Sequence, residues 1–264
     1  MDLQLDGKLV FVSGSTKGIG RAIAESLLKE GARVIINGRS GTDQVAKDMA
    51  SLGDVIAVDG DLSAAEDSER ICREIESHGQ LDVLINNMGI FNPKPFAEIS
   101  DEEWRQFFDV NVLSTVRLSR YFFPKMLKQD FARIINIASE AGMRGLESMV
   151  HYSMTKGAQI VIGRGMANLT KGTGTNITVN SVLPGPTLTE GVNQWLKDSA
   201  AGQGKTEAQF VSEFFQETEP DSLLQRFIKP EEIAAVVAFI ASPLSAAING
   251  ASIKAEGGLI KSIV

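Results

Sequence analysis

The sequence predicts an α/β protein with a mostly parallel sheet and helices on both faces. Apolar runs typical of buried strands alternate with helical spacing of apolar residues along most of the chain. The 25 glycines among the 264 residues favour the same architecture. Such alternation produces a mostly parallel sheet with right-handed crossovers. We expect one domain spanning residues 1–264, because no linker, repeat or low-complexity tract divides the chain.

A third observation concerns the position of the polar motifs. Each motif follows directly after a predicted strand, at residues 14–20, 61, 87–89, 139 and 184–187. Ligands of parallel sheets bind beyond the carboxyl ends of the strands. We therefore expect these motifs to line one site.

The composition argues against several classes of protein. The net charge of −7 gives no support to a nucleic-acid surface or a polybasic membrane patch. The single cysteine, Cys72, excludes a disulfide framework and a cysteine-based metal site. The histidines His78 and His151 are far apart in sequence, so no metal site is expected. The first residues lack the apolar stretch of a signal peptide, and no run reaches the ~18 residues of a spanning helix, so we expect a cytoplasmic protein without membrane contact.

The N-terminal half contains four predicted strands. Each is a short apolar run followed by turn residues: residues 8–13, 33–37, 55–58 and 81–85. One helix is expected at residues 21–30, with Gly31 as its C-terminal cap. Another is expected from an N-cap at Ser63 to about residue 77.

The C-terminal half alternates less regularly. A long helix is expected from residue 101 to about residue 129, with a kink at Pro124. Strands and a helix follow at residues 132–138, 152–171 (the helix), 176–182 and 248–255. Between them, Thr206 and Gln209 form a predicted capping box, and Pro230 opens another helix.

The turn after the first strand has the spacing Gly14-x-x-x-Gly18-x-Gly20. This spacing is neither Gly-x-Gly-x-x-Gly nor a P-loop. Glycines let a backbone approach a pyrophosphate, and the start of the next helix offers it free N–H groups. The alternative is a tight strand–helix turn that binds nothing.

A short stretch near the middle of the chain can handle protons. Tyr152 and Lys156 are four residues apart, which places them on one face of a helix. The lysine charge is expected to draw the tyrosine pKa down from about 10. Ser139 ends the preceding strand and can reach the tyrosine, so the three residues could bind and protonate a carbonyl oxygen. Alone, the pair also fits a half-buried tyrosine beside a solvated lysine.

Six motifs stand in order along the chain: Gly14-x-x-x-Gly18-x-Gly20; Asp61-Leu62; Asn86-Asn87-Met88-Gly89; the set Asn111, Ser139, Tyr152 and Lys156; Pro184-Gly185 with Thr187 and Thr189; and Ala255-Glu256-Gly257-Gly258. Together they resemble the short-chain dehydrogenase/reductase (SDR) family in its shorter, classical form, over about residues 7–260. Met88 departs from the family's usual alanine, and Glu256 stands where an Asp-Gly-Gly is common.

The resemblance implies a Rossmann-type, doubly wound sheet of seven strands, a nicotinamide cofactor, and hydride transfer between a ketone or aldehyde and an alcohol. It makes Tyr152 the acid in reduction and the base in oxidation. Ser139 would hydrogen-bond the substrate oxygen, and Lys156 would favour the phenolate and bind the nicotinamide ribose. The amide of Asn111 would hold a water that relays protons through Lys156.

The resemblance also implies which residues hold the cofactor. They are Gly14, Ser15, Thr16, Lys17, Gly18, Ile19, Gly20, Arg39, Ser40, Asp61, Leu62, Asn87, Gly89, Tyr152, Lys156, Pro184, Gly185 and Thr187. The second strand ends without the acid that NAD enzymes place there for the ribose 2′-OH. Arg39 can pair with a 2′-phosphate and Lys17 could assist, so NADP is the preferred cofactor and NAD the alternative.

Other functions compete with this interpretation. A 3-oxoacyl-thioester (acyl carrier protein) reductase would carry nearly the same motifs. A cofactor-binding regulatory protein without turnover is a different class, and the intact Ser139, Tyr152 and Lys156 argue against it. A serine hydrolase would need a Gly-x-Ser-x-Gly elbow, which the chain lacks. The expected partners are a small carbonyl or alcohol substrate and further copies of the chain, as a tetramer or dimer.

Residues 188–227 are expected to form a lid over the substrate. On a helix beginning near Thr206, Phe210 and Phe214 lie four residues apart, as do Val211 and Phe215. This apolar face must pack either on the body of the domain or on an apolar part of the substrate. Glycines at 202 and 204 would supply flexibility.

Overall fold

The computed structural model of the protein describes residues 1–174 and 176–263. They form a seven-stranded sheet in the order β3-β2-β1-β4-β5-β6-β7, in which every neighbouring pair is parallel. The strands are β1 (Leu9–Val12), β2 (Arg33–Gly38), β3 (Val55–Asp59), β4 (Val83–Asn86), β5 (Phe131–Ile137), β6 (Asn176–Pro184) and β7 (Ser252–Ala255). The predicted doubly wound α/β fold is confirmed.

The strand order reverses between β1 and β4. From β1 the chain builds outward through β2 to β3, and from β4 it builds the other way to β7. Such a reversal opens a crevice beyond the carboxyl ends of the two central strands. The glycine turn begins just after β1, and Asn86 ends β4, so two of the predicted motifs meet at this crevice.

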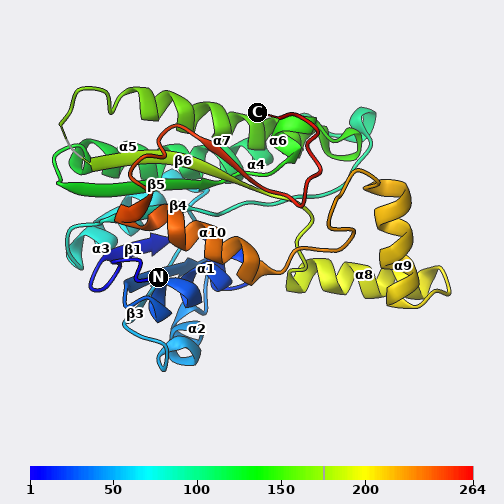
Figure 1. Ribbon diagram of the computed structural model, residues 1–264, viewed down its shortest axis with the longest axis horizontal. Coiled ribbons are helices and arrows are strands. Elements are labelled where there is room, and N and C mark those ends of the chain that lie inside the picture. Colours follow the sequence, from blue (N-terminus) through cyan, green and yellow to red (C-terminus); the bar gives the residue numbers. More distant parts are fainter. Residues whose placement is uncertain (175, 264) are drawn as a thin grey trace.

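Helices cover both faces of the sheet (Figure 1). One core receives apolar side chains from α1 (Gly18–Lys29), α2 (Thr42–Met49) and α10 (Pro230–Ala241). The other receives them from α3 (Ala65–Ser77), α5 (Ser114–Met126) and α7 (Val150–Asn168). Successive residues of a strand point to opposite faces, so Val10 and Val12 of β1 belong to the first core while Leu9 and Phe11 belong to the second.

Several boundaries differ from the sequence predictions. α1 begins at Gly18 rather than residue 21, because the last glycines of the turn already belong to its first turn. The polar segment that forms α2 was not predicted. The predicted N-cap at Ser63 is wrong: Ala64 precedes α3, and the Ser63 hydroxyl donates to Asp61 Oδ1 at 2.7 Å. β7 begins at Ser252 rather than residue 248.

The long helix predicted from residue 101 is divided into consecutive pieces. α4 (Asp101–Phe107) is followed by a π-helical turn (Phe108–Leu113) and then by α5. Pro124 lies in the last turn of α5, which ends at Met126. π-helical turns are rare in proteins, and those that occur are often found at functional sites. This one carries the predicted site residue Asn111.

Residues 188–227 project from the body of the domain (Figure 1). They contain α8 (Glu190–Gly202), α9 (Glu207–Glu213) and a π-helical turn (Phe214–Thr218). The predicted capping box of Thr206 and Gln209 opens α9 as expected, whereas α8 was not predicted.

The apolar face of this segment packs within the segment itself. Leu196, Phe215 and Phe227 are buried together, and Val192, Phe210, Val211 and Phe214 pack against them. Trp195 contacts the rings of Phe210 and Phe214 edge-on. A pocket of about 590 Å³ is bounded by the same segment, between Leu196, Val211 and Phe227. The segment therefore has a small core of its own, which neither packing expectation described.

Four shorter helical elements lie between the main helices and strands in the described part of the domain. They are α6 (Ala141–Arg144) and the 3-10 turns Phe96–Glu98, Glu147–Met149 and Pro243–Ser245. Within the described residues, no helix has the length and apolar character needed to cross a membrane.

Candidate active site

The glycine turn follows β1 at the carboxyl edge of the sheet, where Gly14 and Gly18 are half-buried. Gly14 and Gly18 have φ angles of +60° and +59°, which favour glycine. A side chain at Gly20 would come within 2.4 Å of Asn87 Nδ2. The Ser15 hydroxyl donates to Val12 O at 2.7 Å and accepts from Asn37 N at 2.9 Å, which pins the turn between β1 and β2. The turn is therefore shaped by backbone and small side chains, as a pyrophosphate cradle requires.

One N–H group of this turn already binds a carboxylate. Gly18 N, at the start of α1, donates to Glu190 Oε2 at 2.9 Å. Glu190 is the first residue of α8, and Thr189 before it caps that helix. The carboxylate thus occupies the kind of anion position that a helix N-terminus offers.

The ends of β2 and β3 lie beside the turn. Gly38 closes β2 and would place a side chain 2.5 Å from Thr16 Cγ2, so Thr16 sits at the end of this strand. Arg39 and Ser40 follow it and are exposed. Asp59, opposite Gly38 in the sheet, accepts hydrogen bonds from the backbone and hydroxyl of Thr42 at 3.1 and 2.7 Å. These bonds hold the pKa of Asp59 below its usual range.

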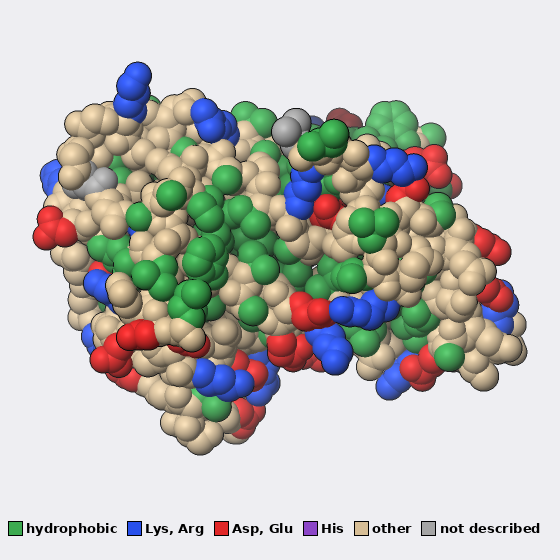
Figure 2. Space-filling model, in the orientation of Figure 1, with side chains coloured by type: hydrophobic (Ala, Val, Ile, Leu, Met, Phe, Trp, Pro, Cys, Tyr) green, Lys and Arg blue, Asp and Glu red, His purple; other side chains and the backbone are tan. Residues whose placement is uncertain are grey.

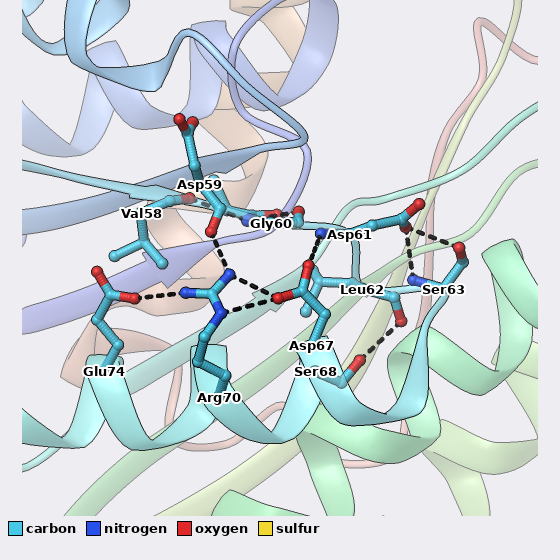
Figure 3. Close-up of polar contacts among 11 residues, drawn as sticks. Val58, Asp59, Gly60, Asp61, Leu62, Ser63, Asp67, Ser68, Arg70 and Glu74 are labelled. Carbon is cyan, nitrogen blue, oxygen red and sulfur yellow. Dashed lines mark hydrogen bonds and ion pairs between the residues drawn. The ribbon is translucent and has the colours of Figure 1, made fainter.

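The turn after β3 is fixed by its own polar contacts (Figure 3). Asp61 accepts from the backbone and hydroxyl of Ser63, and its N–H donates to Asp67 Oδ2 at 2.5 Å. Arg70 braces the same turn through the Asp59 carbonyl at 2.7 Å. Leu62 is fully buried, and its carbonyl accepts from Ser68 Oγ at 2.8 Å. These contacts brace the turn, and Asp61 is half-buried.

The proton-handling residues meet where β5 ends and α7 begins. Ser139 follows β5, and Tyr152 and Lys156 lie one turn apart on α7. Lys156 Nζ donates to Ile137 O at 2.9 Å and lies 5.7 Å from the centre of the Tyr152 ring. A Cβ atom at Gly89 would lie 3.3 Å from this nitrogen, a tight contact that the lysine would have to relieve by shifting.

Backbone contact sets the distance between the Ser139 turn and α7. A Cβ atom at Gly142 would lie 2.7 Å from the nitrogen of Gly157, closer than any real Cβ contact. Two glycines thus let the turn and the helix touch directly. Ser139 Oγ itself accepts from Ala141 N at 3.1 Å, which holds the hydroxyl in place.

The ionisation of the pair differs from the expectation. The pKa of Tyr152 is raised to about 12. Desolvation is the largest cause and raises it, the hydrogen bond with Ser139 lowers it, and the Glu140 carboxyl raises it. Desolvation also lowers the pKa of Lys156 to about 7. The predicted lowering of the tyrosine pKa by Lys156 is therefore wrong for this structure, because desolvation is the largest cause and raises it.

Asn111 is fully buried in the π-helical turn, and its amide is bonded to the protein. Nδ2 donates to Ile90 O at 2.9 Å and to Thr155 Oγ1 at 3.0 Å, while Oδ1 accepts from Ile90 N at 2.8 Å. Both amide hydrogens are thus used by protein groups. The expected water-holding amide is instead a brace between the loop after β4 and α7.

The Pro184 motif closes the site at the end of β6. Gly185 lies against the backbone of Glu256, where a Cβ atom would be 2.6 Å from the Glu256 carbonyl oxygen. The Thr187 hydroxyl is buried and donates to Gly185 O at 2.8 Å. Thr189 lies against Gly18, so this motif and the glycine turn face each other across the crevice.

The sequence interpretation missed a buried charged cluster behind Ser139. Arg144 donates to both carboxylate oxygens of Glu219 at 2.7 Å, which ties α6 to the end of the 188–227 segment. Glu140 lies 3.4 Å from Arg144, and desolvation raises the pKa of its carboxyl to about 7. Both charged residues can be seen in the sequence, but nothing in it indicates that Arg144 and Glu219, 75 positions apart, are in contact.

Comparison with known proteins agrees with this arrangement. A family model described as short chain dehydrogenase matches residues 8–200. The chain is 48% identical over 265 residues to the uncharacterised oxidoreductase YvrD of Bacillus subtilis (strain 168), with 100% of both chains covered. It is 35% identical to the 3-oxoacyl-[acyl-carrier-protein] reductase FabG of Aquifex aeolicus (strain VF5), covering 98% of this chain and 100% of the relative.

A solved structure is also similar throughout. The L-sorbose reductase of Gluconobacter frateurii, complexed with NADPH and L-sorbose, superposes with a TM-score of 0.92 at 28% identity, and 100% of each chain is covered.

Proposed function

Since the chain belongs to the short-chain dehydrogenase family, we propose that it is an NADP-dependent oxidoreductase in which Tyr152 is the acid and base. Members of the family act on CH–OH groups, and this chain is an oxidoreductase of that kind. The proposed reaction interconverts a ketone or aldehyde and an alcohol by hydride transfer. The observation that carries the proposal is the meeting of Ser139, Tyr152 and Lys156 beside the glycine turn at one edge of the sheet.

Each residue has a role that its position supports. The Ser139 hydroxyl and the Tyr152 phenol can both donate to the oxygen of a bound carbonyl group. A phenol with a pKa of about 12 is protonated at neutral pH, so Tyr152 is poised to give its proton to the developing alkoxide. Lys156 lies close enough for its charge to stabilise the phenolate that remains.

The residues of the crevice fit a dinucleotide with a 2′-phosphate, which would supply the hydride. The glycine turn would hold the pyrophosphate, and the Pro184, Gly185 and Thr187 motif would face the nicotinamide half. β2 ends without an acid, Asp59 opposite it is bonded to Thr42, and Arg39 is exposed beside Thr16. This arrangement favours NADP over NAD, and the similar L-sorbose reductase holds NADPH.

Replacing Arg39 with alanine tests the cofactor assignment. NADP binding should weaken by a factor of about 10 to 150, the effect of losing a charge-assisted hydrogen bond, while NAD binding changes little. Arg33 begins β2 and pairs with Asp54 at 2.8 Å, so Arg33→Ala is the matched control. Equal weakening of both cofactors, measured by titration, would remove Arg39 from recognition of the 2′-phosphate.

A second candidate is reduction of 3-oxoacyl thioesters. The 35% identity to the Aquifex aeolicus 3-oxoacyl-[acyl-carrier-protein] reductase favours it. The net charge of −7, however, does not favour binding of an acidic carrier protein. A panel of ketones, aldehydes, alcohols and acetoacetyl thioester with NADPH or NADP, followed at the nicotinamide absorbance, separates the two. No turnover with any substrate would favour a regulatory protein that only binds the cofactor.

We further propose a single cytoplasmic domain with a lid at residues 188–227, assembled as a tetramer or dimer. Two exposed apolar surfaces support assembly. On α7 and the π-helical turn, Phe108, Met154 and Val161 are exposed. Apolar side chains also gather on the face that carries α10, where Phe239 is exposed (Figure 2). Light scattering of the purified protein tests this assembly.

A further inference from the structure

Gln159 shares a helix face with the catalytic pair. It follows Lys156 by three residues and Tyr152 by seven on α7, so the three side chains project from the same face. Gln159 is fully buried. A buried glutamine needs hydrogen-bond partners for both ends of its amide.

The partners of Gln159 fix the orientation of its amide. Oε1 accepts from Lys156 Nζ at 3.0 Å, and Nε2 donates to the backbone carbonyl of Asn111 at 2.8 Å. Nε2 also reaches Thr115 Oγ1 at 3.0 Å. A lysine nitrogen donates and a carbonyl accepts, so the reverse orientation would lose both bonds.

Gln159 therefore connects the lysine to the π-helical turn. The two acceptors on Lys156 Nζ, Ile137 O and Gln159 Oε1, stabilise the ammonium form against the desolvation that opposes it. With two of its hydrogens bound in this way, the ammonium has one hydrogen left for the side where Tyr152 and Gly89 lie.

We propose that Gln159 is a positioning residue that holds Lys156 in its charged, catalytic orientation, and that it fills the link between Lys156 and Asn111 that a water was expected to provide. The proposal rests on the catalytic role proposed for Tyr152 and Lys156. An amide neither gains nor loses a proton at neutral pH. The link therefore holds the lysine but carries no proton.

The test compares Gln159→Met, which keeps the volume but accepts no strong hydrogen bond, with Gln159→Glu, which keeps the acceptor. The Lys156 side-chain signal is followed by NMR in cofactor-free protein with 13C-labelled lysine, and Lys156→Arg assigns it. The titration midpoint should move to lower pH by about one unit or more in Gln159→Met, and to higher pH in Gln159→Glu. Unchanged midpoints in both variants would overturn the proposal.

Kinetics supply an independent measurement. In Gln159→Met, kcat should fall on the order of 10- to 100-fold with little change in KM, and the pH dependence of kcat should move with the lysine midpoint. Ser119→Ala is the control. It loses a buried hydrogen bond, 3.2 Å long, that Ser119 accepts from Asn86 and that does not involve the lysine. It should lower stability and leave the pH profile unchanged.

The two measurements separate this proposal from the proposed function. If Gln159→Met does not fold, the midpoint of Gln159→Glu decides, and an unchanged or lowered midpoint counts against the link. If the midpoints move but Tyr152→Phe keeps wild-type turnover, the link stands and the mechanism built on Tyr152 fails. A loss of stability with normal midpoints and normal kcat would reduce Gln159 to packing.

Discussion

The proposed catalytic corner around Tyr152 and Lys156 and the 188–227 segment are held in different ways. In the corner, Lys156, Asn111 and Gln159 are buried and bonded to backbone groups of the sheet and its helices. The segment has its own aromatic core. Prominent polar contacts join it to the domain, Glu190 to Gly18 and Glu219 to Arg144. The corner is thus held by bonds among buried groups. The segment expected to enclose the substrate is joined to the domain by carboxylate contacts and by backbone bonds from Leu223 and Leu224 to Gly257 O at 2.8 and 3.2 Å.

The largest expected effect lies in the corner. Tyr152→Phe should lower kcat by a factor of about 10² to 10⁴, because the ring stays and only the acid is lost. Cofactor binding, measured by titration, should be nearly unchanged. The only other tyrosine, Tyr121, is half-buried on α5 and bonded to Glu76, so Tyr121→Phe is a matched control with wild-type turnover expected. Full activity in Tyr152→Phe would dismiss the tyrosine as the acid.

Cutting one tether should loosen the segment and spare the corner. Arg144→Met removes the two bonds to Glu219, which is mostly buried. Hydrogen exchange at residues 198–206 should quicken about 10- to 100-fold, while exchange around Lys156 stays slow. The control is Arg226→Met. Arg226 also joins the segment to the domain, by a paired contact with Glu232 of α10, but at an exposed position where ion pairs contribute little, so exchange should change little.

Hydrogen exchange of the unmodified protein tests the lid itself. Exchange at residues 198–206 should be fast without ligands and slow with NADP and a substrate. Equal protection in both states would identify the segment as a fixed element with an ordinary core.

The contact between Glu190 and Gly18 should oppose cofactor binding. Glu190 holds Gly18 N–H and brings a negative charge to the turn proposed for the pyrophosphate. Glu190→Gln should tighten NADP binding by a factor of about 3 to 10, since a neutral acceptor competes less well for the N–H. Asp198→Asn changes an acid of α8 that bonds Gln194 instead and should leave the affinity unaltered. Weaker binding in Glu190→Gln would mean that the carboxylate assists the cofactor.

A smaller effect concerns pH. The pKa of Glu140 is raised by desolvation to about 7, so the folded protein binds a proton there that the unfolded chain releases above about pH 4.5. The free energy of unfolding should therefore fall from pH 4.5 to 7, by at most ~1.4 kcal/mol per pH unit, and stay level above. Glu140→Gln should lack this fall. Urea denaturation measures the free energy of unfolding at each pH. The same pH dependence in the wild type and in Glu140→Gln would exclude Glu140 as the cause.

The sheet and the gathering of its motifs could be predicted because they depend on local patterns. A parallel sheet brings the ends of its strands to one edge, so motifs 14–20, 87–89 and 139 needed only correct strand assignments. The apolar runs in the sequence were sufficient to assign those strands. The helix at Glu190–Gly202 escaped because residues 187–229 show no regular alternation.

The details of the site depend on contacts that spacing does not reveal. The Tyr152 pKa is raised mainly by desolvation, which depends on the assembled fold and not on the spacing from Lys156. Asn111 bonds Ile90 because the loop after β4 folds against the π-helical turn. Gln159 could have been singled out, since a polar residue three positions after Lys156 falls on the catalytic face of the helix.

The contact between Gly142 and Gly157 has a consequence for altering this protein by directed evolution. Because no side chain separates the Ser139 turn from α7, the spacing of the two hydroxyl groups does not depend on how neighbouring side chains pack. Libraries that vary exposed positions such as Met143 or Leu188 leave this backbone contact in place. Any residue larger than glycine at 142 would push the turn off the helix, and no change of substrate would restore the geometry.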